Sequence, residues 1–267
     1  MSNPKSTKTP VYIGVDVGSS HTKVAVIDAD SQLVGHRVSK SGIDFSATAE
    51  HCLSGALEMA RCDRDRIAGV VSTGYGRHNV AYAGFNRTEI GCHAKGCYFY
   101  FPSAITVIDI GGQDNKIIKM DGEGKRTDFK MNRKCAAGTG AFLEEMSTRL
   151  DIPLSDMDGL AGKSTETVKI GSYCTVFSAT EVLEYIRHGK KVEDIIKGLF
   201  QSVIQRLLEM DSLTEKVVMT GGVVAHNPYL VKMAEQQIGR NIWVPEYPQL
   251  TGAIGAALYA MASINGD

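Results

Sequence analysis

The sequence predicts an α/β protein made of two similar lobes with a nucleotide cleft between them. One observation behind this prediction is a motif near the amino terminus that recurs near residue 110. A second is the alternation of short β-branched segments with segments of helical periodicity. Strands that alternate with helices are typical of sheets whose faces are covered by helices.

The repeat aligns without a gap at an offset of 93 residues. Residues 15–28 (VDVGSSHTKVAVID) fall on residues 108–121 (IDIGGQDNKIIKMD), and the apolar positions agree as well. The matched polar and glycine positions are Asp16 with Asp109, Gly18 with Gly111, Lys23 with Lys116 and Asp28 with Asp121. Chance could give a few of these matches, but their identical spacing favours duplication.

Each copy predicts a strand, a tight glycine turn and a second strand, followed by a third strand at residues 33–39 or 126–132. Further strands are predicted at residues 68–73, 216–222 and 241–245, and helical periodicity predicts helices at residues 46–61, 140–150, 175–188, 192–210 and 252–262. We therefore expect a disordered tail over residues 1–10, one lobe from residues 11–103 and 251–267, and a second lobe from residues 104–250.

Composition sets limits on the class of function. The 267 residues are 43% apolar and 22% charged with a net charge of −1, which gives no support for nucleic acid or an anionic membrane as the main partner. No apolar run is long enough to span a membrane, and the first ten residues lack the apolar core of a signal peptide. Six cysteines without a secretory signal favour a reducing, cytoplasmic location.

The two glycine turns carry the expected chemistry. Gly18 permits a tight turn, and Asp16 could hold Mg²⁺ directly or through water. Asp109 occupies the equivalent place in the second turn, where Gln113 could orient an attacking water. Ordinary hairpin turns also use glycine and aspartate, but two copies in register favour a clamp on a triphosphate and its metal. The candidate phosphate contacts are Gly18, Ser19, Ser20, Thr22, Lys23, Gly111 and Gly112.

A third glycine turn, TGGVVAHNP at residues 220–228, follows a strand and precedes a helix, which is a natural place for backbone to approach an adenosine. The candidate contacts in and after this segment are Gly221, Gly222, Asn227 and Gln249. The stretch DGLAGKST ends like a P-loop, but its leading glycine would fall at Met157 and no strand precedes it. It is therefore not a Walker A motif.

The motifs DVGSSHTK, DIGGQD, TGG and TGAIGAAL resemble those of the acetate and sugar kinase, Hsp70 and actin superfamily. More narrowly, GYGR, DIGGQD, KCAAGTGAFLE, SYCTVFSATEV and PQLTGAIGAALYA are similar to the ATPase activators (archerases) of 2-hydroxyacyl-CoA dehydratases, a family shared with the ATPase subunits of benzoyl-CoA reductases. The resemblance covers about residues 11–260. It implies duplicated actin-like (ribonuclease H-like) lobes and ATP or ADP with Mg²⁺.

The resemblance also implies a homodimer with one 4Fe–4S cluster, which Cys135 and Cys174 of each chain would hold. It implies a reduced ferredoxin or flavodoxin as electron donor, and an iron–sulfur dehydratase or reductase as partner. The residues agree with this expectation. The two cysteines lie 39 residues apart and each precedes a helical pattern, so they form no local CxxC clip. A cubane takes four thiolates, and a two-fold dimer would supply the other two.

Burial as small packing residues is the ordinary role of cytoplasmic cysteines, and we expect it for Cys52 and Cys62. Cys92 and Cys97 are expected to be structural or surface thiols, and His93 between them is expected to be a satisfied histidine rather than a ligand. Arg77, in the segment STGYGRHNV, could serve either a strand-to-helix turn or the nucleotide. The motifs around Cys135 and Cys174 set those two cysteines apart.

These observations favour an ATP-dependent electron-transfer protein. The partner could be a 2-hydroxyacyl-CoA dehydratase, a benzoyl-CoA reductase or a double-cubane reductase. A small-molecule kinase of the same superfamily is the second hypothesis, but it leaves Cys135 and Cys174 unexplained. A nucleotide-switched scaffold without chemistry is the third.

Overall fold

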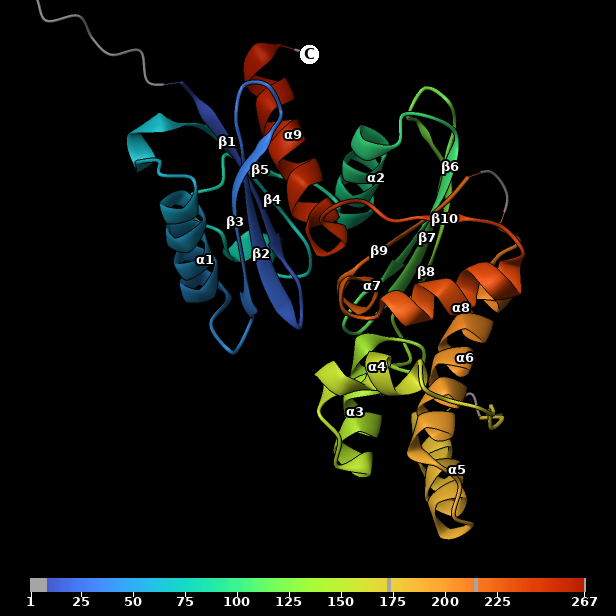
Figure 1. Cartoon of the computed structure of the whole chain (residues 1–267). Helices are drawn as coiled ribbons and strands as arrows, with labels where there is room; N and C mark the ends of the chain where they lie inside the picture. Colours follow the sequence, from blue (N-terminus) through green and yellow to red (C-terminus); the bar gives the residue numbers. More distant parts are fainter. Residues whose placement is uncertain (1–8, 172–173, 214–215, 267) are drawn as a thin grey trace, which may run out of the picture. The chain divides into compact units, whose positions relative to one another are not determined.

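The computed structural model describes residues 9–171, 174–213 and 216–266. These residues divide into two compact units (Figure 1). Unit 1 holds the described residues up to Tyr100 and from Leu250 onward, and unit 2 is Phe101–Gln249. Of the expected disordered tail, residues 1–8 lie outside the described part, and residues 9 and 10 are exposed. None of the helices in the described ranges has the length and apolar character needed to cross a bilayer.

Unit 1 contains a five-stranded sheet in the order β3-β2-β1-β4-β5. The strands are β1 (Val11–Val17), β2 (His21–Ile27), β3 (Leu33–Lys40), β4 (Ile67–Thr73) and β5 (Phe85–Asn86). The first three strands form an antiparallel meander, whereas β4 lies parallel to β1 and β5 lies parallel to β4.

Unit 2 repeats this sheet in the order β10-β9-β6-β7-β8 with the same strand directions. Its strands are β6 (Ile105–Ile110), β7 (Asn115–Met120), β8 (Arg126–Asn132), β9 (Lys216–Thr220) and β10 (Ile242–Trp243). Even the irregularities correspond, because the register shifts at Val26/Ile27 in β2 and at Lys119/Met120 in β7, 93 residues later. The structure therefore confirms the duplicated α/β lobes.

The two faces of β1 explain how unit 1 is layered. Ile13, Val15 and Val17 are fully buried in a cluster with the apolar face of α1 (Phe45–Met59). Residues between them point to the opposite face, since side chains alternate along a strand. There, a Cβ on Gly14 would stand 1.8 Å from the carbonyl oxygen of Ala253, so α9 packs directly on the strand backbone.

Two helices pack against each other on that second face of unit 1. These are α2 (Glu89–Tyr100) and α9 (Thr251–Asn265). A Cβ on Gly96 would stand 2.1 Å from the Thr251 carbonyl oxygen, and one on Gly255 would stand 1.8 Å from the Cys92 carbonyl oxygen. The helices can approach this closely only because both positions lack side chains.

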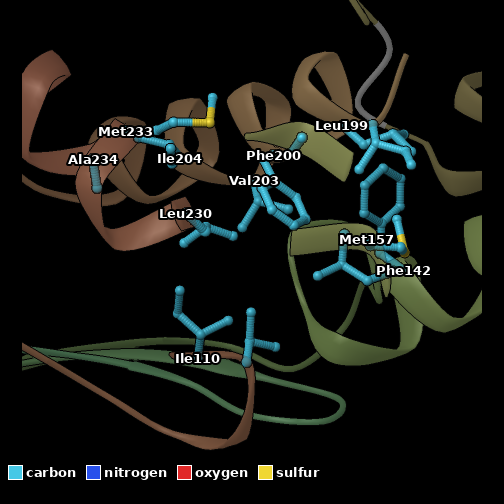
Figure 2. Packing of buried hydrophobic residues seen from close by; sticks show 14 of the residues in the cluster. Ile110, Phe142, Met157, Leu199, Phe200, Val203, Ile204, Leu230, Met233 and Ala234 are labelled. Carbon is cyan, nitrogen blue, oxygen red and sulfur yellow. The ribbon is translucent and has the colours of Figure 1, made fainter. Parts of the chain in front are cut away.

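In unit 2 the helices cover one face of the sheet with a large apolar core. The helices are α3 (Gly140–Leu150), α4 (Met157–Ala161), α5 (Thr175–Arg187), α6 (Val192–Met210), α7 (Gly222–His226) and α8 (Pro228–Ile238). Figure 2 shows Ile110 pointing from the sheet toward the helices that carry Val203 and Leu230. Phe142 of α3 and Met157 of α4 join the same cluster, so the segment that starts α3 is tied into this core.

The helix predictions agree with the structure to within a few residues at each end. The bounds of α3 and α6 coincide with residues 140–150 and 192–210. The helix α2 was not among the predicted helices. Its sequence, EIGCHAKGCYFY, contains two glycines, and apart from Ile90 it buries small or polar side chains, so it lacks the wide apolar stripe of an amphipathic helix.

Candidate nucleotide and cysteine sites

The first predicted phosphate turn joins β1 to β2 at the end of the antiparallel hairpin. The amide of Gly18 donates to the carbonyl of His21 over 3.1 Å and closes the turn. A Cβ on Gly18 would stand 2.8 Å from that carbonyl oxygen, so a larger residue would not fit. The side chain of Ser19 is exposed, and Ser20 is half-buried beside it. The carbonyl of Ser20 accepts from the amide of Ser41 over 3.0 Å, so its backbone is tied to the segment after β3.

Asp16 lies at the end of β1, directly opposite Lys23 of β2. Lys23 Nζ donates to Asp16 Oδ2 over 3.0 Å, and the aspartate is 1% exposed. Asp16 Oδ1 accepts no hydrogen bond from any described residue. A buried carboxylate oxygen without a donor is costly unless a cation satisfies it. The residues present thus fit a magnesium ion at Asp16 Oδ1, which prefers such oxygen ligands.

The loop after β4 closes over the other side of this carboxylate. Gly74 has a φ of +87°, and a Cβ there would stand 2.5 Å from Asp16 Oδ1. The amide of Gly76 donates to the carbonyl of Val17 over 2.9 Å. Arg77 Nη1 donates to the carbonyl of Gly74 over 3.1 Å. Arg77, whose role the sequence left open, therefore supports the turn that encloses Asp16.

The second predicted turn joins β6 to β7 in the same way. The amide of Gly111 donates to the carbonyl of Asp114 over 2.9 Å, and Gln113 is exposed at the turn. Lys116 Nζ donates to Asp109 Oδ2 over 3.1 Å and to Asp114 Oδ1 over 2.8 Å. The lysine side chain is 1% exposed. Lys116 and Asp114 were not among the predicted site residues, although the repeat had already aligned Lys116 with Lys23.

The third predicted turn lies beside the second one, because β9 runs parallel to β6. Gly221 has a φ of +102°, and a Cβ on it would stand 2.3 Å from the carbonyl oxygen of Ile110. A Cβ on Gly222 would stand 3.3 Å from Gln249 Nε2. Unit 2 thus brings Gly111, Gly221 and Gln249 together at the carboxyl ends of β6 and β9. In α/β sheets, ligand sites form at this end of parallel strands.

Two of the predicted nucleotide contacts make internal hydrogen bonds instead. Thr22 is fully buried, and its hydroxyl lies 2.9 Å from the hydroxyl of Ser41, which donates in turn to the carbonyl of Gly18. Asn227 Nδ2 donates to the carbonyl of Val223 over 2.8 Å. Thr22 therefore stabilises the first turn through Ser41, and Asn227 stabilises the end of α7 through its bond to Val223.

The second predicted phosphate turn is hydrogen-bonded to the start of α3. The amide of Gly140 donates to the carbonyl of Gly111 over 3.0 Å, and the amide of Ala141 donates to that of Gly112 over 2.7 Å. A Cβ on Gly140 would stand 3.2 Å from the Cα of Gly112. Gly140 therefore lets α3 begin against the turn, and two of the amides at the start of the helix already have acceptors.

Cys135 lies in the loop between β8 and α3. This loop is fixed at several points, since Asn115 Nδ2 donates to the carbonyl of Gly138 over 2.8 Å and the amide of Thr139 donates to that of Ala136 over 3.0 Å. The Cys135 side chain forms no disulfide with a described residue and is half-buried. Because Asn115 begins β7, the loop that carries Cys135 is held by the same hairpin that forms the second turn.

Cys174 is the residue that caps α5, and its carbonyl accepts from the amide of Ser178 over 2.9 Å. Its side chain also forms no disulfide with a described residue and is half-buried. The helices α3 and α5 contact each other; Cys174 lies at the start of α5, whereas Cys135 lies in the loop that precedes α3. Val176 and Phe177, just after Cys174, are 67% and 65% exposed. Both cysteines are thus accessible enough to serve as ligands.

The remaining cysteines have different surroundings. Cys52, Cys92 and Cys97 are fully buried, and Cys62 is half-buried. Burial raises the pKa of the Cys92 thiol to about 12, despite its hydrogen bond with Thr73. Because the thiolate is the metal-binding form, a thiol of this kind is a poor ligand at neutral pH. Within the described ranges, no group of three or more His, Cys, Asp or Glu side chains could jointly hold a metal ion.

The P-loop-like stretch has no phosphate-binding geometry. Its first residues form the short helix α4, and Asp158 Oδ1 accepts from the amide of Tyr229 over 2.9 Å. Ser164 donates to Asp194 Oδ1 over 2.8 Å rather than facing an open loop. The structure confirms that this segment is not a Walker A motif.

The two duplicated sheets, each ending in a glycine turn beside an aspartate, define an ATPase-type fold of the acetate and sugar kinase, Hsp70 and actin superfamily. A glucokinase of the ROK family from Streptomyces griseus, in complex with glucose and AMPPNP, matches with a TM-score of 0.57 at 14% identity, over 94% of this chain and 99% of that chain. This likeness shows a shared fold alone.

The chain belongs to the BadF/BadG/BcrA/BcrD ATPase family, which it matches over residues 13–260. The activator of lactoyl-CoA dehydratase from Anaerotignum propionicum is 42% identical over 93% of this chain and 96% of its own length. The activator of the 2-hydroxyisocaproyl-CoA dehydratase from Clostridium difficile, solved with bound ADPNP, has a TM-score of 0.89 at 37% identity and covers 96% of both chains. The resemblance noted from the motifs is confirmed.

Proposed function

We propose that this protein is an ATP-dependent activator that passes one electron from a reduced ferredoxin or flavodoxin to an iron–sulfur enzyme. The partner enzyme would be a 2-hydroxyacyl-CoA dehydratase, by analogy with the relatives that carry the name of activator. A benzoyl-CoA reductase or a double-cubane reductase is the alternative partner.

The observation that carries the proposal is the contact between the second phosphate turn and α3. Gly111 and Gly112 accept hydrogen bonds from the first two residues of the helix that follows the Cys135 loop. A turn that changes position when it binds or releases a γ-phosphate would move this helix start with it. A simple kinase needs no such link between its phosphate turn and a cysteine.

Several residues would act on the nucleotide itself. Asp16 would hold Mg²⁺ through Oδ1 while Lys23 holds Oδ2, and the backbone of Gly18 and Ser19 would bind phosphate oxygens. Asp109 lies at the equivalent position of the second turn, and Gln113 would orient the attacking water there. Gly221, Gly222 and Gln249 would bind the adenosine at the edge of the sheet in unit 2.

Cys135 and Cys174 would hold a 4Fe–4S cluster together with the same two cysteines of a second copy of the chain, because a cubane takes four thiolates. Their half-buried side chains, which form no disulfide with a described residue, fit this role, whereas the buried Cys92 thiol does not. When bound, the cluster would supply one-electron redox chemistry. The exposed Val176 and Phe177 beside Cys174 would then be covered by the second copy.

The proposal is tested by iron analysis of protein purified without oxygen. We expect about four irons per two chains, a brown colour and a dimer in solution. Cys135→Ala and Cys174→Ala should each lose the iron, whereas the matched variant Cys92→Ala should keep it. A colourless protein that hydrolyses ATP, or a Cys135→Ala variant with unchanged iron, would support the kinase hypothesis instead.

A further inference from the structure

A run of basic residues occupies the exposed edge of the sheet in unit 2. β8 is the last strand of that sheet, and its residues Arg126–Lys130 are all exposed. Residues 125–134 carry five cations and one acid, although the whole chain has a net charge of −1. The cations are Lys125, Arg126, Lys130, Arg133 and Lys134. We call residues 125–134 the basic strip.

Most of the charge on the basic strip is not compensated by a neighbouring acid. Lys130 Nζ lies 2.8 Å from Asp211 Oδ2, but Asp211 also pairs with Lys119 of β7. The other four cations of the strip have no ion-pair partner among the described residues. Phe129 lies among them and is 47% exposed, and Arg126 Cζ stands 5.1 Å from the centre of its ring. Exposed aromatic and arginine side chains are enriched at protein interfaces.

Charged residues on an edge strand can also serve only to prevent pairing with another chain. The duplicated strand of unit 1 provides a comparison. β3 is an edge strand too, and residues 32–41, at the same offset of 93, carry two cations, Arg37 and Lys40. The helix α1 packs against β3, whereas Arg126–Lys130 of β8 are exposed. The larger positive charge thus belongs to the copy that is followed by a predicted cluster cysteine.

The basic strip leads directly into the loop of Cys135. Lys134 precedes the cysteine in the sequence, and its amide donates to Asn132 Oδ1 over 3.3 Å. Asn132 Nδ2 lies 3.5 Å from the carbonyl oxygen of Cys135. A protein bound to the strip would therefore lie beside the cluster that Cys135 is proposed to hold. The strip contains none of the predicted nucleotide contacts, so its charge is the same with and without nucleotide.

We propose that the basic strip is the docking site of the electron donor, and that the donor is a small protein with an acidic surface around its redox group. This inference rests on the proposed electron-transfer function and adds the surface and charge of one partner. A surface that does not depend on nucleotide suits a donor, which must reload the protein before each round of ATP use.

The expected complex is weak and short-lived. Opposite charges would raise the rate of encounter, and the ring of Phe129 would be covered by the donor. Electron-transfer complexes use small interfaces, so one strand and one aromatic ring can supply much of such a contact. In the complex one electron would leave the reduced donor for the oxidised cluster, and no bond would form or break.

The test measures reduction of the oxidised, cluster-loaded dimer by a reduced ferredoxin of strongly negative net charge, in a stopped-flow spectrometer without oxygen. Lys125→Gln/Arg126→Gln removes two charges at the end of the strip that is remote in sequence from Cys135. Its second-order rate constant should fall about tenfold at low ionic strength. At about 1 M salt, where charges are screened within about 3 Å, it should equal that of wild type. Phe129→Ala should lower the rate constant at both salt concentrations.

Arg37→Gln/Lys40→Gln, in the equivalent strand of unit 1, is the matched control and should stay within about twofold of wild type. Dithionite, a small donor that needs no docking surface, should reduce every variant within about threefold of the wild-type rate. An unchanged rate in Lys125→Gln/Arg126→Gln, or an equal fall in the control, would overturn the inference. Normal reduction followed by slow transfer to the dehydratase would also overturn it, because the strip would then bind the acceptor. A wild-type dimer without a reducible cluster would instead overturn the proposed function.

Discussion

The amide of Gly140 donates a hydrogen bond of 3.0 Å to the carbonyl of Gly111. The two residues belong to different motifs, one a predicted phosphate turn and the other the helix start after Cys135. The bond makes these motifs one structural unit. The bond also occupies an amide at the start of α3 that has no acceptor within the helix and could otherwise have faced a cluster. The loop that carries Cys135 is therefore stabilised by its contact with the second predicted phosphate turn.

Enlarging Gly140 should uncouple the two motifs. In Gly140→Val the added atoms would meet Gly112 Cα and push the helix start away from the turn, at a cost of about 1–3 kcal/mol. We expect ADPNP to change the alkylation rate of Cys135 in the cluster-free wild type, and this nucleotide effect to disappear in the variant. Gly159→Ala, where nothing lies within 4 Å of the added Cβ, is the control. An intact nucleotide effect in Gly140→Val would contradict the coupling.

The buried lysine of the second turn should contribute strongly to stability. Lys116→Met leaves Asp109 without its cation, and removing one partner of a buried pair costs about 3–5 kcal/mol. Lys23→Met should cost less, because the side chain of Lys23 is 17% exposed and water partly screens its ion pair with Asp16, whereas the side chain of Lys116 is 1% exposed. Urea unfolding of both variants measures the difference. The double variant Lys116→Met/Asp109→Asn should recover part of the loss, and equal costs at the two lysines would refute this explanation.

Alkylation should separate the cysteines into two groups. In cluster-free, folded protein, iodoacetamide should modify Cys135 and Cys174 but leave Cys92 and Cys97 unmodified, since the latter are fully buried and burial raises the pKa of Cys92. Mass spectrometry of the peptides measures each site, and unfolded protein provides the control in which all are modified. Modification of Cys92 at the rate of Cys135 would be incompatible with the structure.

Acid should weaken the loop that leads toward Cys174. Asp194 Oδ1 accepts from the amide of Glu166, the hydroxyl of Ser164 and the amide of Thr165, and these donors lower the pKa of the carboxyl below its usual value of 3.8. A lowered pKa stabilises the fold above 3.8, and this contribution is lost as the pH falls through the folded-state pKa. Between pH 5 and pH 3 the urea midpoint should therefore fall further in wild type than in Asp194→Asn. An equal fall of the urea midpoint in the two proteins would exclude this role of Asp194.

The hairpins with their aspartate–lysine pairs could be predicted because their information is local. The same seven-residue spacing occurs in both copies of the repeat. It places Lys23 opposite Asp16 in one hairpin and Lys116 opposite Asp109 in the other. The helix α2 could not be predicted, since its glycines serve contacts with α9, which is more than 150 residues away. Gly140 likewise packs on Gly112, a contact with another segment of the chain that no local pattern marks. Contacts between distant segments leave no periodic signal.

The same limit applies to individual side chains at the site. Thr22 lies in a phosphate-turn motif, yet alternation along β2 directs its hydroxyl to Ser41 in the interior. His93 lies near Asp16 only because α2 and α9 pack together. Both placements follow from tertiary packing and not from the residue type.

The most direct test of the central claim is an anaerobic single-turnover experiment. Reduced protein is mixed with an oxidised 2-hydroxyacyl-CoA dehydratase, with and without MgATP, and the iron–sulfur absorbance of both proteins is followed. We predict that one electron per dimer reaches the dehydratase only when MgATP is present, and that Cys174→Ala transfers none. Transfer at the same rate without nucleotide, or ATP hydrolysis with no transfer to any iron–sulfur partner, would contradict the account.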